Sequence, residues 1–394
     1  MISFLFWLFS ISIIYTYAGY PLLLGLFARS KPKHARYPKH EPFVTILIAA
    51  YNEQGSIIQK LENTLLLNYP RKKLQIVVAA DGSSDNTPDL VGKFLNRNVE
   101  LSYQKERRGK MAAINRAMEI VRGDIVVFSD ANNMYEPETL KALVAPFGDK
   151  KIGAVSGAKI ILKGDGALGD SEGAYWKYES WIKKQETRLG CTTGVSGEVW
   201  AIRRELFERP PDGIINDDFY MAMRIIKKGY CMVYAPDARS AERVSLTAKD
   251  EVTRRTRIVA GRYQAISLAS ELVPFNWPLV TWQIISHKFM RPLVPLAMIG
   301  AFISNVIVLV WPPISGGSAF WQLAAPWNLI FIGLQLSFYF LAGIGSLLPL
   351  KNRLARLLYI PAFLVNSNLA ALYGLFRYLR GGQSTLWTKV SRRE

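Results

Sequence analysis

The chain has 394 residues, of which 50% are hydrophobic and 20% charged, and its formal net charge is +18. Aromatic residues make up 12% of the chain, which excludes intrinsic disorder, and two cysteines are too few for a disulfide scaffold. Three histidines are too few for a histidine-rich zinc site. The positive charge indicates a nucleic acid, an anionic lipid or a phosphorylated substrate as partner.

An uninterrupted apolar segment opens the chain. Residues 3–28 carry no charge, and about 20 apolar residues are enough for a helix to cross a bilayer. A cleaved signal peptide, the alternative, would have a basic start and a shorter apolar core. We therefore predict a transmembrane helix over residues 1–28. The basic residues that follow it place this side in the cytoplasm and the N-terminus outside. They are Arg29, Lys31, Lys33, Arg36 and Lys39.

A second apolar block fills the C-terminal part of the chain. Residues 275–291 mix aliphatic residues with tryptophans, His287, Lys288 and Arg291, which is typical of helices that lie in the membrane interface. We predict interfacial helices over residues 265–291 and two transmembrane helices within residues 292–350.

The last apolar segment has two interpretations. Hydropathy alone favours a fourth span over residues 358–379, which would leave the basic tail outside. The segment also contains Pro361, Asn366 and Asn368. We predict an interfacial or re-entrant helix within residues 351–380 and a cytoplasmic tail over residues 381–394, with a fourth span as the alternative.

The middle of the chain, residues 29–264, alternates short apolar runs with segments that are compatible with helices. The expected strands cover residues 43–50, 74–80 and 124–129, and the expected helices cover residues 54–67, 86–97 and 136–146. Continuous apolar runs are typical of parallel strands buried on both faces. This pattern predicts an open α/β sheet, and such sheets bind ligands at the carboxyl ends of their strands.

Acidic and amide residues follow all three expected strands, within residues 50–53, 81–85 and 130–133. Any one of them could cap a helix, but together they predict a nucleotide and metal site. The basic turn at residues 107–110 adds cationic groups for phosphate, unless it is merely solvated. No Gly-x-Gly-x-x-Gly follows the first strand, which disfavours a dinucleotide-dependent dehydrogenase, and no Gly-Lys-Ser/Thr phosphate loop is present.

These motifs, in this order, resemble those of the membrane-embedded family 2 glycosyltransferases, the group of cellulose, hyaluronan, chitin and poly-N-acetylglucosamine synthases. The matching motifs are Ala50-Tyr51-Asn52-Glu53, Asp81-Gly82-Ser83-Ser84-Asp85, Gly109-Lys110 with Ala113 and Asn115, Asp130-Ala131-Asn132, Thr193-Gly194-Val195-Ser196-Gly197, Asn216-Asp217-Asp218 and Arg254-x-x-Arg257. The resemblance implies an α/β, GT-A-like (Rossmann-like) cytoplasmic domain inserted between transmembrane helices. It also implies an inverting transfer from a nucleoside diphosphate sugar, usually a UDP-sugar.

The resemblance further implies the donor side of the site. Tyr51, Glu53 and Asp81 would hold the base and ribose, and Lys110 would meet the base or the phosphates. Asp130 and Asn132 match the family's metal and diphosphate motif, which implies Mg²⁺ or Mn²⁺. The family often has a second aspartate where this chain has Asn132, so metal binding is weaker or Asn132 acts through water.

On the acceptor side, Asp218 matches the family's catalytic aspartate, the base that takes the acceptor proton. Asp217 replaces a more usual glutamate and would orient the site. An acidic first turn favoured by the helix dipole is the alternative for both residues. The acceptor loop would include Thr193, Gly194, Ser196 and Gly197, with a plain turn as the alternative.

Two further groups follow from the resemblance. Arg254 and Arg257 would neutralise the leaving diphosphate, or else contact anionic headgroups. The family's usual tryptophan after this arginine is Ile258 here, which leaves the acceptor and processivity open. Trp387 and Lys389 would belong to a cytoplasmic gating tail that closes over the nucleotide, with an interfacial anchor as the alternative.

We therefore predict an inverting, metal-dependent glycosyltransferase in a bacterial-type inner or plasma membrane, with its catalytic domain in the cytoplasm and membrane lipids around it. It would transfer a sugar from a UDP-sugar to a growing polysaccharide, with coupling to translocation left open. Transfer of one sugar to a lipid is the alternative. A transporter is disfavoured because charges within the apolar segments are scarce. A nucleic-acid partner is not expected, because no recognition motif is present.

Overall fold

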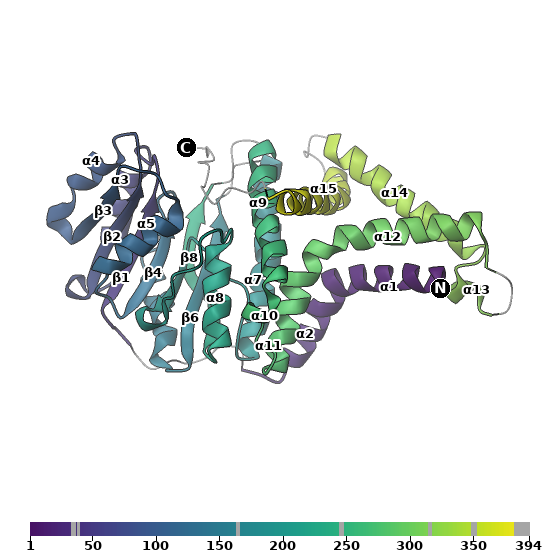
Figure 1. The fold of residues 1–394 in the computed structure, drawn as a ribbon, viewed down its shortest axis with the longest axis horizontal. Coiled ribbons are helices and arrows are strands. Elements are labelled where there is room, and N and C mark those ends of the chain that lie inside the picture. The colour runs from purple at the N-terminus through teal and green to yellow at the C-terminus, as the bar shows by residue number, and fades with distance from the viewer. Residues whose placement is uncertain are drawn as a thin grey trace. The chain divides into compact units, whose positions relative to one another are not determined.

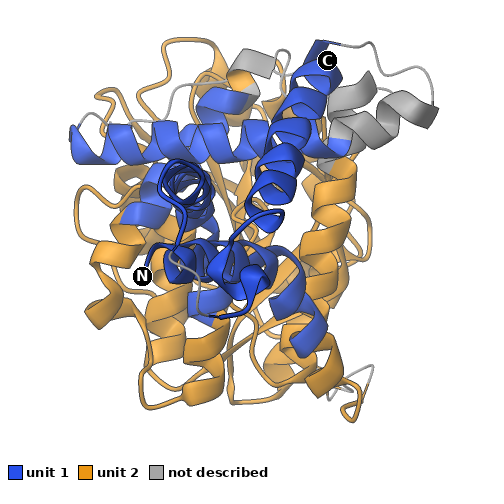
Figure 2. Cartoon of the chain, turned by 90° about the vertical axis from the view of Figure 1, so that its right-hand side faces the viewer, with its two compact units in different colours: residues 1–23, 252–263, 284–382 blue, residues 24–251, 264–283, 383–394 orange. Residues whose placement is uncertain are grey.

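A computed structural model describes residues 1–32, 37, 40–162, 166–243, 248–313, 317–347 and 353–381 (Figure 1). The chain divides into two compact units, which Figure 2 shows in different colours. The helical unit comprises residues 1–23, 252–263 and 284–382. The sheet unit comprises residues 24–251, 264–283 and 383–394.

The sheet unit is built on one eight-stranded sheet with the strand order β3-β2-β1-β4-β7-β6-β8-β5. The strands are β1 (Val44–Ala50), β2 (Leu74–Asp81), β3 (Val99–Gln104), β4 (Ile125–Asp130), β5 (Met134–Tyr135), β6 (Ile152–Ile161), β7 (Trp200–Arg203) and β8 (Cys231–Glu242). The neighbours β3, β2, β1 and β4 run parallel, whereas β7 is antiparallel to both β4 and β6. The three predicted strands are confirmed as β1, β2 and β4, and the sheet is mixed.

Helices lie between these strands, from α3 to α8, and three more, α9 to α11, follow β8. They are α3 (Ile57–Leu65), α4 (Thr87–Gly92), α5 (Lys110–Ala117), α6 (Thr139–Val144), α7 (Gly166–Arg188), α8 (Asp217–Lys227), α9 (Ala248–Ser267), α10 (Ala269–Leu272) and α11 (Pro278–Gln283). Every residue of β1 and β2 is buried, as expected for parallel strands covered on both faces. In register, Ala50 lies beside Ala80 and Ala49 beside Asp130, so the three predicted motifs leave the sheet at one edge.

The helical unit consists mainly of long apolar helices. They are α1 (Ile2–Ile14), which continues through π-helical residues 15–19 into α2 (Tyr20–Ala28), then α12 (Met290–Val310), α13 (Ala319–Gln322), α14 (Trp327–Leu347) and α15 (Arg353–Leu379). Within this unit α1 packs along α12, and α14 packs against α15 (Figure 1). Three helical segments among the described residues are long and apolar enough to cross a membrane: Ile2–Ala28, Pro278–Val310 and Trp327–Leu347.

The structure differs from the sequence prediction at the start of the second span. We expected an interfacial segment to end at residue 291, but Pro278–Val310 is one continuous helical segment that includes π-helical residues 284–289. Two of the polar residues that suggested an interface are buried, since His287 is 1% exposed and Lys288 is 6% exposed, whereas Arg291 is partly buried. Polar groups in membrane helices usually face the protein interior, because their exposure to lipid costs free energy. The place of each segment in a membrane stays a prediction.

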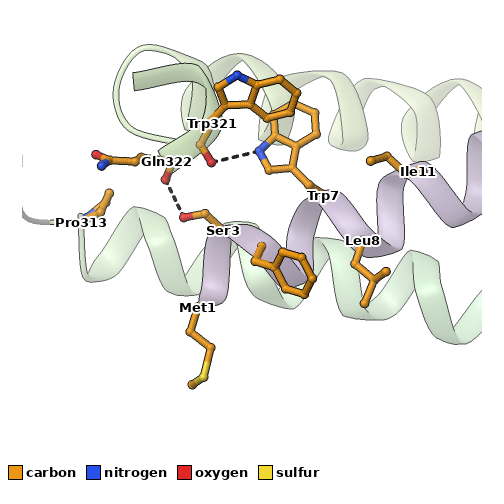
Figure 3. Close-up of a pocket in the computed structure, with 9 residues that line it drawn as sticks. Met1, Ser3, Trp7, Leu8, Ile11, Pro313, Trp321 and Gln322 are labelled. Carbon is orange, nitrogen blue, oxygen red and sulfur yellow. Dashed lines mark hydrogen bonds between the residues drawn. The ribbon is translucent and has the colours of Figure 1, made fainter. Parts of the chain in front are cut away.

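An aromatic cluster ties the start of α1 to α13 (Figure 3). The Trp7 indole donates to the Trp321 carbonyl at 3.1 Å, and the Ser3 hydroxyl donates to the Gln322 carbonyl at 2.6 Å. The rings of Trp7 and Phe320 lie 4.6 Å apart, and a pocket of ≈ 630 Å³ opens beside them. Tryptophan-rich clusters of this kind are typical of membrane–water interfaces.

Candidate active site

The loops that follow β1 and β2 are bonded to each other. The Asn52 side chain accepts a hydrogen bond from the Ser84 amide at 2.8 Å. The Glu53 amide donates to the Thr87 hydroxyl at 2.8 Å, and that hydroxyl donates to Asp85 at 2.5 Å. Asn52 is in the left-handed region with φ of 54°, a conformation that asparagine tolerates better than most residues. These bonds hold the two predicted donor loops as one surface.

Asp81 supports the next loop. It is 1% exposed, and its two oxygens accept hydrogen bonds from the amides of Arg108 at 2.9 Å and Gly109 at 2.8 Å. Gly82 has φ of +60°, and a Cβ there would lie 2.7 Å from the Arg107 amide nitrogen. The basic turn is therefore pressed against the end of β2. A contact between Asp81 and a base stays a prediction.

Tyr51 and Glu53 lie at the same edge. The Arg107 guanidinium lies 3.9 Å from the centre of the Tyr51 ring, a cation–π distance. The Glu53 carboxylate accepts a hydrogen bond from the Ser56 hydroxyl at 2.6 Å. A base that stacked on Tyr51 would therefore share the ring with a cationic group, which suits a ligand that also carries phosphate.

Lys110 connects the donor edge with the predicted catalytic residues. It stands at the start of α5, and its ammonium lies 2.8 Å from Asp130 at the end of β4. Burial lowers the pKa of Lys110, but neighbouring carboxylates outweigh burial and raise the pKa above its ordinary value. Those carboxylates belong to Asp130, Asp217 and Asp218. The Asp-Asp pair of α8 thus lies within electrostatic reach of the strand-end site.

The loop at residues 192–197 is held by charged side chains from α7. Buried Glu186 accepts hydrogen bonds from the Thr192 hydroxyl at 2.7 Å and from the Thr193 amide at 2.8 Å. Buried Lys183 donates to the Ser196 hydroxyl at 2.9 Å. Burial of its ammonium group lowers the pKa of Lys183 to about 8. The Gly194 amide lies 3.3 Å from the Thr192 hydroxyl.

Gly197 brings this loop against Asp218. A Cβ at Gly197 would lie 2.6 Å from Oδ2 of Asp218, which is too close for any other residue without displacement of that carboxylate. Asp217 and Asp218 form the first turn of α8, where the helix dipole favours negative charge. The Asp218 carboxylate also accepts a hydrogen bond from the Phe219 amide at 2.7 Å.

The family is decided by the sequence of this sheet unit. Residues 45–209 match the sequence model of Glycosyl transferase family 2. The chain carries a family 2 glycosyltransferase domain. For this domain, the match confirms the resemblance to family 2 glycosyltransferases that the motifs indicated, and with it the enzyme class, a glycosyltransferase.

Two curated relatives match over part of their length. The chain is 28% identical over 262 residues to a probable glycosyltransferase, YdaM, of Bacillus subtilis (strain 168), which covers 61% of this chain and 60% of the relative. It is also 28% identical over 229 residues to a poly-β-1,6-N-acetyl-D-glucosamine synthase of Staphylococcus aureus (strain MSSA476). That match covers 57% of this chain and 55% of the relative. The chain thus spans less than two thirds of the length of either relative.

The fold has a solved counterpart over its whole length. The mannosyltransferase PcManGT from Pyrobaculum calidifontis, solved with GDP-Man and Mn²⁺, superimposes with a TM-score of 0.68 at 23% identity. The match covers 97% of this chain and 100% of that one. The predicted GT-A-like fold of the glycosyltransferase domain is confirmed.

The residues of the domain fit a divalent cation beside Asp130. Asn132 Oδ1 is buried and accepts no hydrogen bond from the part of the chain that the structure describes. Together with the Asp130 carboxylate it offers the hard oxygen ligands that Mg²⁺ or Mn²⁺ takes. No cluster of three or more His, Cys, Asp or Glu side chains that could hold a metal occurs among the described residues. Water and ligand phosphates would have to complete the coordination.

Besides Lys183 and Glu186, further supporting residues of the sheet unit were not predicted from the sequence. Fully buried Lys60 donates to the backbone carbonyl of Asn133 at 2.8 Å, and the side-chain amide of Asn133 donates to the backbone carbonyl of Glu198 at 2.9 Å. Burial of its ammonium group lowers the pKa of Lys60 to about 7. The signal was available, because Ile57, Lys60, Leu61 and Thr64 share the buried face of α3.

Gln264 was not predicted from the sequence either. Its side chain accepts from the Ile215 amide at 2.9 Å and donates to the Gly213 carbonyl at 2.8 Å, which fixes the loop before Asp217. No local pattern indicates it, since the partners are 49 and 51 positions away.

The remaining predicted donor residues lie elsewhere. Arg254 and Arg257 are on α9, within the part of it that belongs to the helical unit. Trp387 and Lys389 lie outside the described residues. Diphosphate binding by the arginines and gating by the tail stay predictions.

Proposed function

We propose that this chain transfers a sugar with inversion from a nucleoside diphosphate sugar, in the first instance a UDP-sugar, to a growing polysaccharide at a membrane. The observation that carries the proposal is the position of Lys110. It pairs with Asp130 on the donor edge and is electrostatically coupled to Asp217 and Asp218 on the other side. One site thus combines groups for a diphosphate with a carboxylate that can accept a proton.

On the donor side, the loops after β1 and β2 receive the nucleoside through Tyr51, Glu53 and Asp81. Lys110 contributes positive charge against the diphosphate as the bond to the sugar breaks. Asp130 and Asn132 would hold Mg²⁺ or Mn²⁺, which, when bound, offsets the charge that develops on the leaving diphosphate.

On the acceptor side, the acceptor hydroxyl attacks the anomeric carbon on the face opposite the leaving diphosphate. The Asp218 carboxylate takes the hydroxyl proton as the new bond forms, and the nucleoside diphosphate departs. The absence of a side chain at Gly197 lets the acceptor loop reach Asp218. Asp217 contributes negative charge beside the base, and Gln264 fixes the loop that presents both.

The membrane location rests on the three apolar helical segments. With the basic cluster after residue 28, we propose that the N-terminus lies outside and the glycosyltransferase domain in the cytoplasm.

Transfer of one sugar to a lipid is the second candidate. One observation favours it: Ile258 stands where the family usually has the tryptophan that follows Arg257. The fold is also similar over its full length to that of PcManGT, which was solved with GDP-Man. GDP-mannose therefore belongs among the donors to be tested.

The test uses the full chain purified into lipid nanodiscs and a panel of UDP-sugars and GDP-mannose with Mg²⁺ or Mn²⁺. Release of nucleoside diphosphate and product size are measured together. We expect one donor to give release and a polymeric product. A product of one sugar on lipid would establish the second candidate, and no release from any donor would contradict both.

A further inference from the structure

A cluster of buried charged side chains lies next to the acceptor loop. Lys159 on β6 pairs with Glu242 on β8 and lies 3.7 Å from Oε1 of Glu198. The side chains of these three residues are 4%, 5% and 11% exposed, respectively. We call Lys159, Lys183, Glu198, Glu242 and Trp176 the buried charged cluster.

Trp176 on α7 lies close to both lysines of this cluster. The Lys159 ammonium is 5.2 Å from the centre of the Trp176 ring, and the Lys183 ammonium is 5.9 Å from it. Both are cation–π distances, which orient the indole. The residue as a whole is only partly buried.

Two polar atoms of the cluster lack a hydrogen bond. Among the residues that the structure describes, neither the Trp176 indole N–H nor Oε1 of Glu198 makes a hydrogen bond, and both atoms are buried. The nearest charged partner of Oε1 is the Lys159 ammonium at 3.7 Å, which is beyond hydrogen-bond distance. Glu198 as a residue is 9% exposed. Leaving a buried donor and a buried acceptor unsatisfied costs free energy, so such groups usually mark a ligand or an ordered water.

The chemistry of the two atoms selects the ligand. One is a donor and the other an acceptor, and both adjoin Lys159, so a group that donates and accepts at once would satisfy both. A hydroxyl does this, whereas a phosphate would face the carboxylates of Glu198 and Glu242. An aromatic ring flanked by hydrogen-bonding groups also matches a sugar, which has an apolar face and a rim of hydroxyls.

The cluster is continuous with the proposed catalytic base. Glu198 directly follows Gly197, where a Cβ would lie 2.6 Å from Asp218, and Lys183 holds Ser196 in the same loop. We propose that the Trp176 indole N–H and the Glu198 carboxylate bind hydroxyl groups of a sugar unit of the acceptor, in a subsite that leads away from Asp218. The inference rests on the proposed function and names its acceptor as a carbohydrate.

The test compares three variants of the full chain in nanodiscs. Trp176→Phe keeps a ring and removes the N–H, and Glu198→Gln keeps the shape and removes the charge. Trp181→Phe is the matched control, because Trp181 lies on the same helix, is 40% exposed and packs near Gly25. The probes are a β-1,6-linked N-acetylglucosamine pentasaccharide and cellopentaose, observed by saturation-transfer NMR, with UDP affinity and Tm measured beside them.

We expect the wild type to bind at least one pentasaccharide. Trp176→Phe should weaken this binding about tenfold, Glu198→Gln should weaken it too, and Trp181→Phe should leave it unchanged, with UDP affinity unaltered in all three. Unchanged oligosaccharide binding in Trp176→Phe, or no binding by the wild type, would overturn the subsite. A parallel loss of UDP affinity and Tm would show a structural role and overturn it as well. Release of nucleoside diphosphate by the wild type decides the proposed function separately.

Discussion

The proposed donor and acceptor sides of the site are built in different ways. On the donor side, neighbouring loops are bonded through backbone amides and short polar side chains, as between Asn52 and Ser84 or between Asp81 and Gly109. On the acceptor side, long charged side chains from α7 reach a buried loop, as Lys183 and Glu186 do. The donor side thus depends on local motifs at strand ends, and the acceptor side on packing between distant segments.

The largest effect is expected on the donor side. Asp130→Ala removes the ion-pair partner of Lys110 and a proposed metal ligand. We expect turnover to fall about 10³- to 10⁵-fold, since a metal supplies several kcal/mol of charge stabilisation. Nucleoside diphosphate release is measured with and without EDTA. The control is Asp124→Ala, because Asp124 directly precedes β4 and Asp130 ends it. Full turnover in excess EDTA would contradict the metal assignment.

The next effect separates the two sides. Asp218→Asn keeps the shape of the side chain and removes its basicity, so turnover should fall about 10²- to 10⁴-fold. UDP affinity should stay unchanged, because the proposed donor contacts come from other loops. Turnover and UDP affinity are measured side by side. The control is Asp212→Asn, whose side chain is 95% exposed.

If Asp218→Asn loses UDP binding together with turnover, the two sides are not separable and Asp218 belongs to the donor side. Near-normal turnover would exclude it as the base.

A smaller effect tests the close approach on the acceptor side. Gly197→Ala places a methyl group 2.6 Å from Oδ2 of Asp218 and must displace the carboxylate. A shift of about 1 Å can cost about 10²-fold in rate, so we expect a loss of that order in kcat with UDP affinity retained. Gly92→Ala is the matched control, because nothing lies within 4 Å of the added Cβ. Equal kcat in both variants would contradict a functional role for the close approach of Gly197 to Asp218.

The smallest expected effect is on the pH dependence of stability. It compares two buried lysines, Lys60 on the proposed donor side and Lys183 on the proposed acceptor side. Burial lowers the pKa of Lys60 to about 7 and that of Lys183 to about 8, against an ordinary value of 10.5. The unfolded chain therefore binds more protons than the folded one between these values and 10.5, so each lysine makes stability rise with pH in that window. Lys60→Met should flatten the rise from pH 7, and Lys183→Met the rise from pH 8. Thermal unfolding from pH 6 to 11 measures this, and an unchanged profile would mean that the lysines stay protonated.

The local part of this molecule could be predicted from its sequence. Parallel strands buried on both faces appear as continuous apolar runs, so β1, β2 and β4 were evident, and the polar residues after them had to meet at one edge. Apolar length alone predicted helices able to span a membrane. The glycosyltransferase family followed from motifs that lie within these short segments.

Tertiary structure decided the rest. The antiparallel insertion of β7 between β4 and β6 depends on pairings across long sequence separations, which no local pattern encodes. Polar residues around His287 suggested an interface in sequence, yet packing buries them in a continuous helical segment. The roles of three polar side chains were not predicted either, those of Lys60, Gln264 and Trp176. Their neighbours come from distant segments of the chain, and a buried polar group depends on the partners that the fold provides.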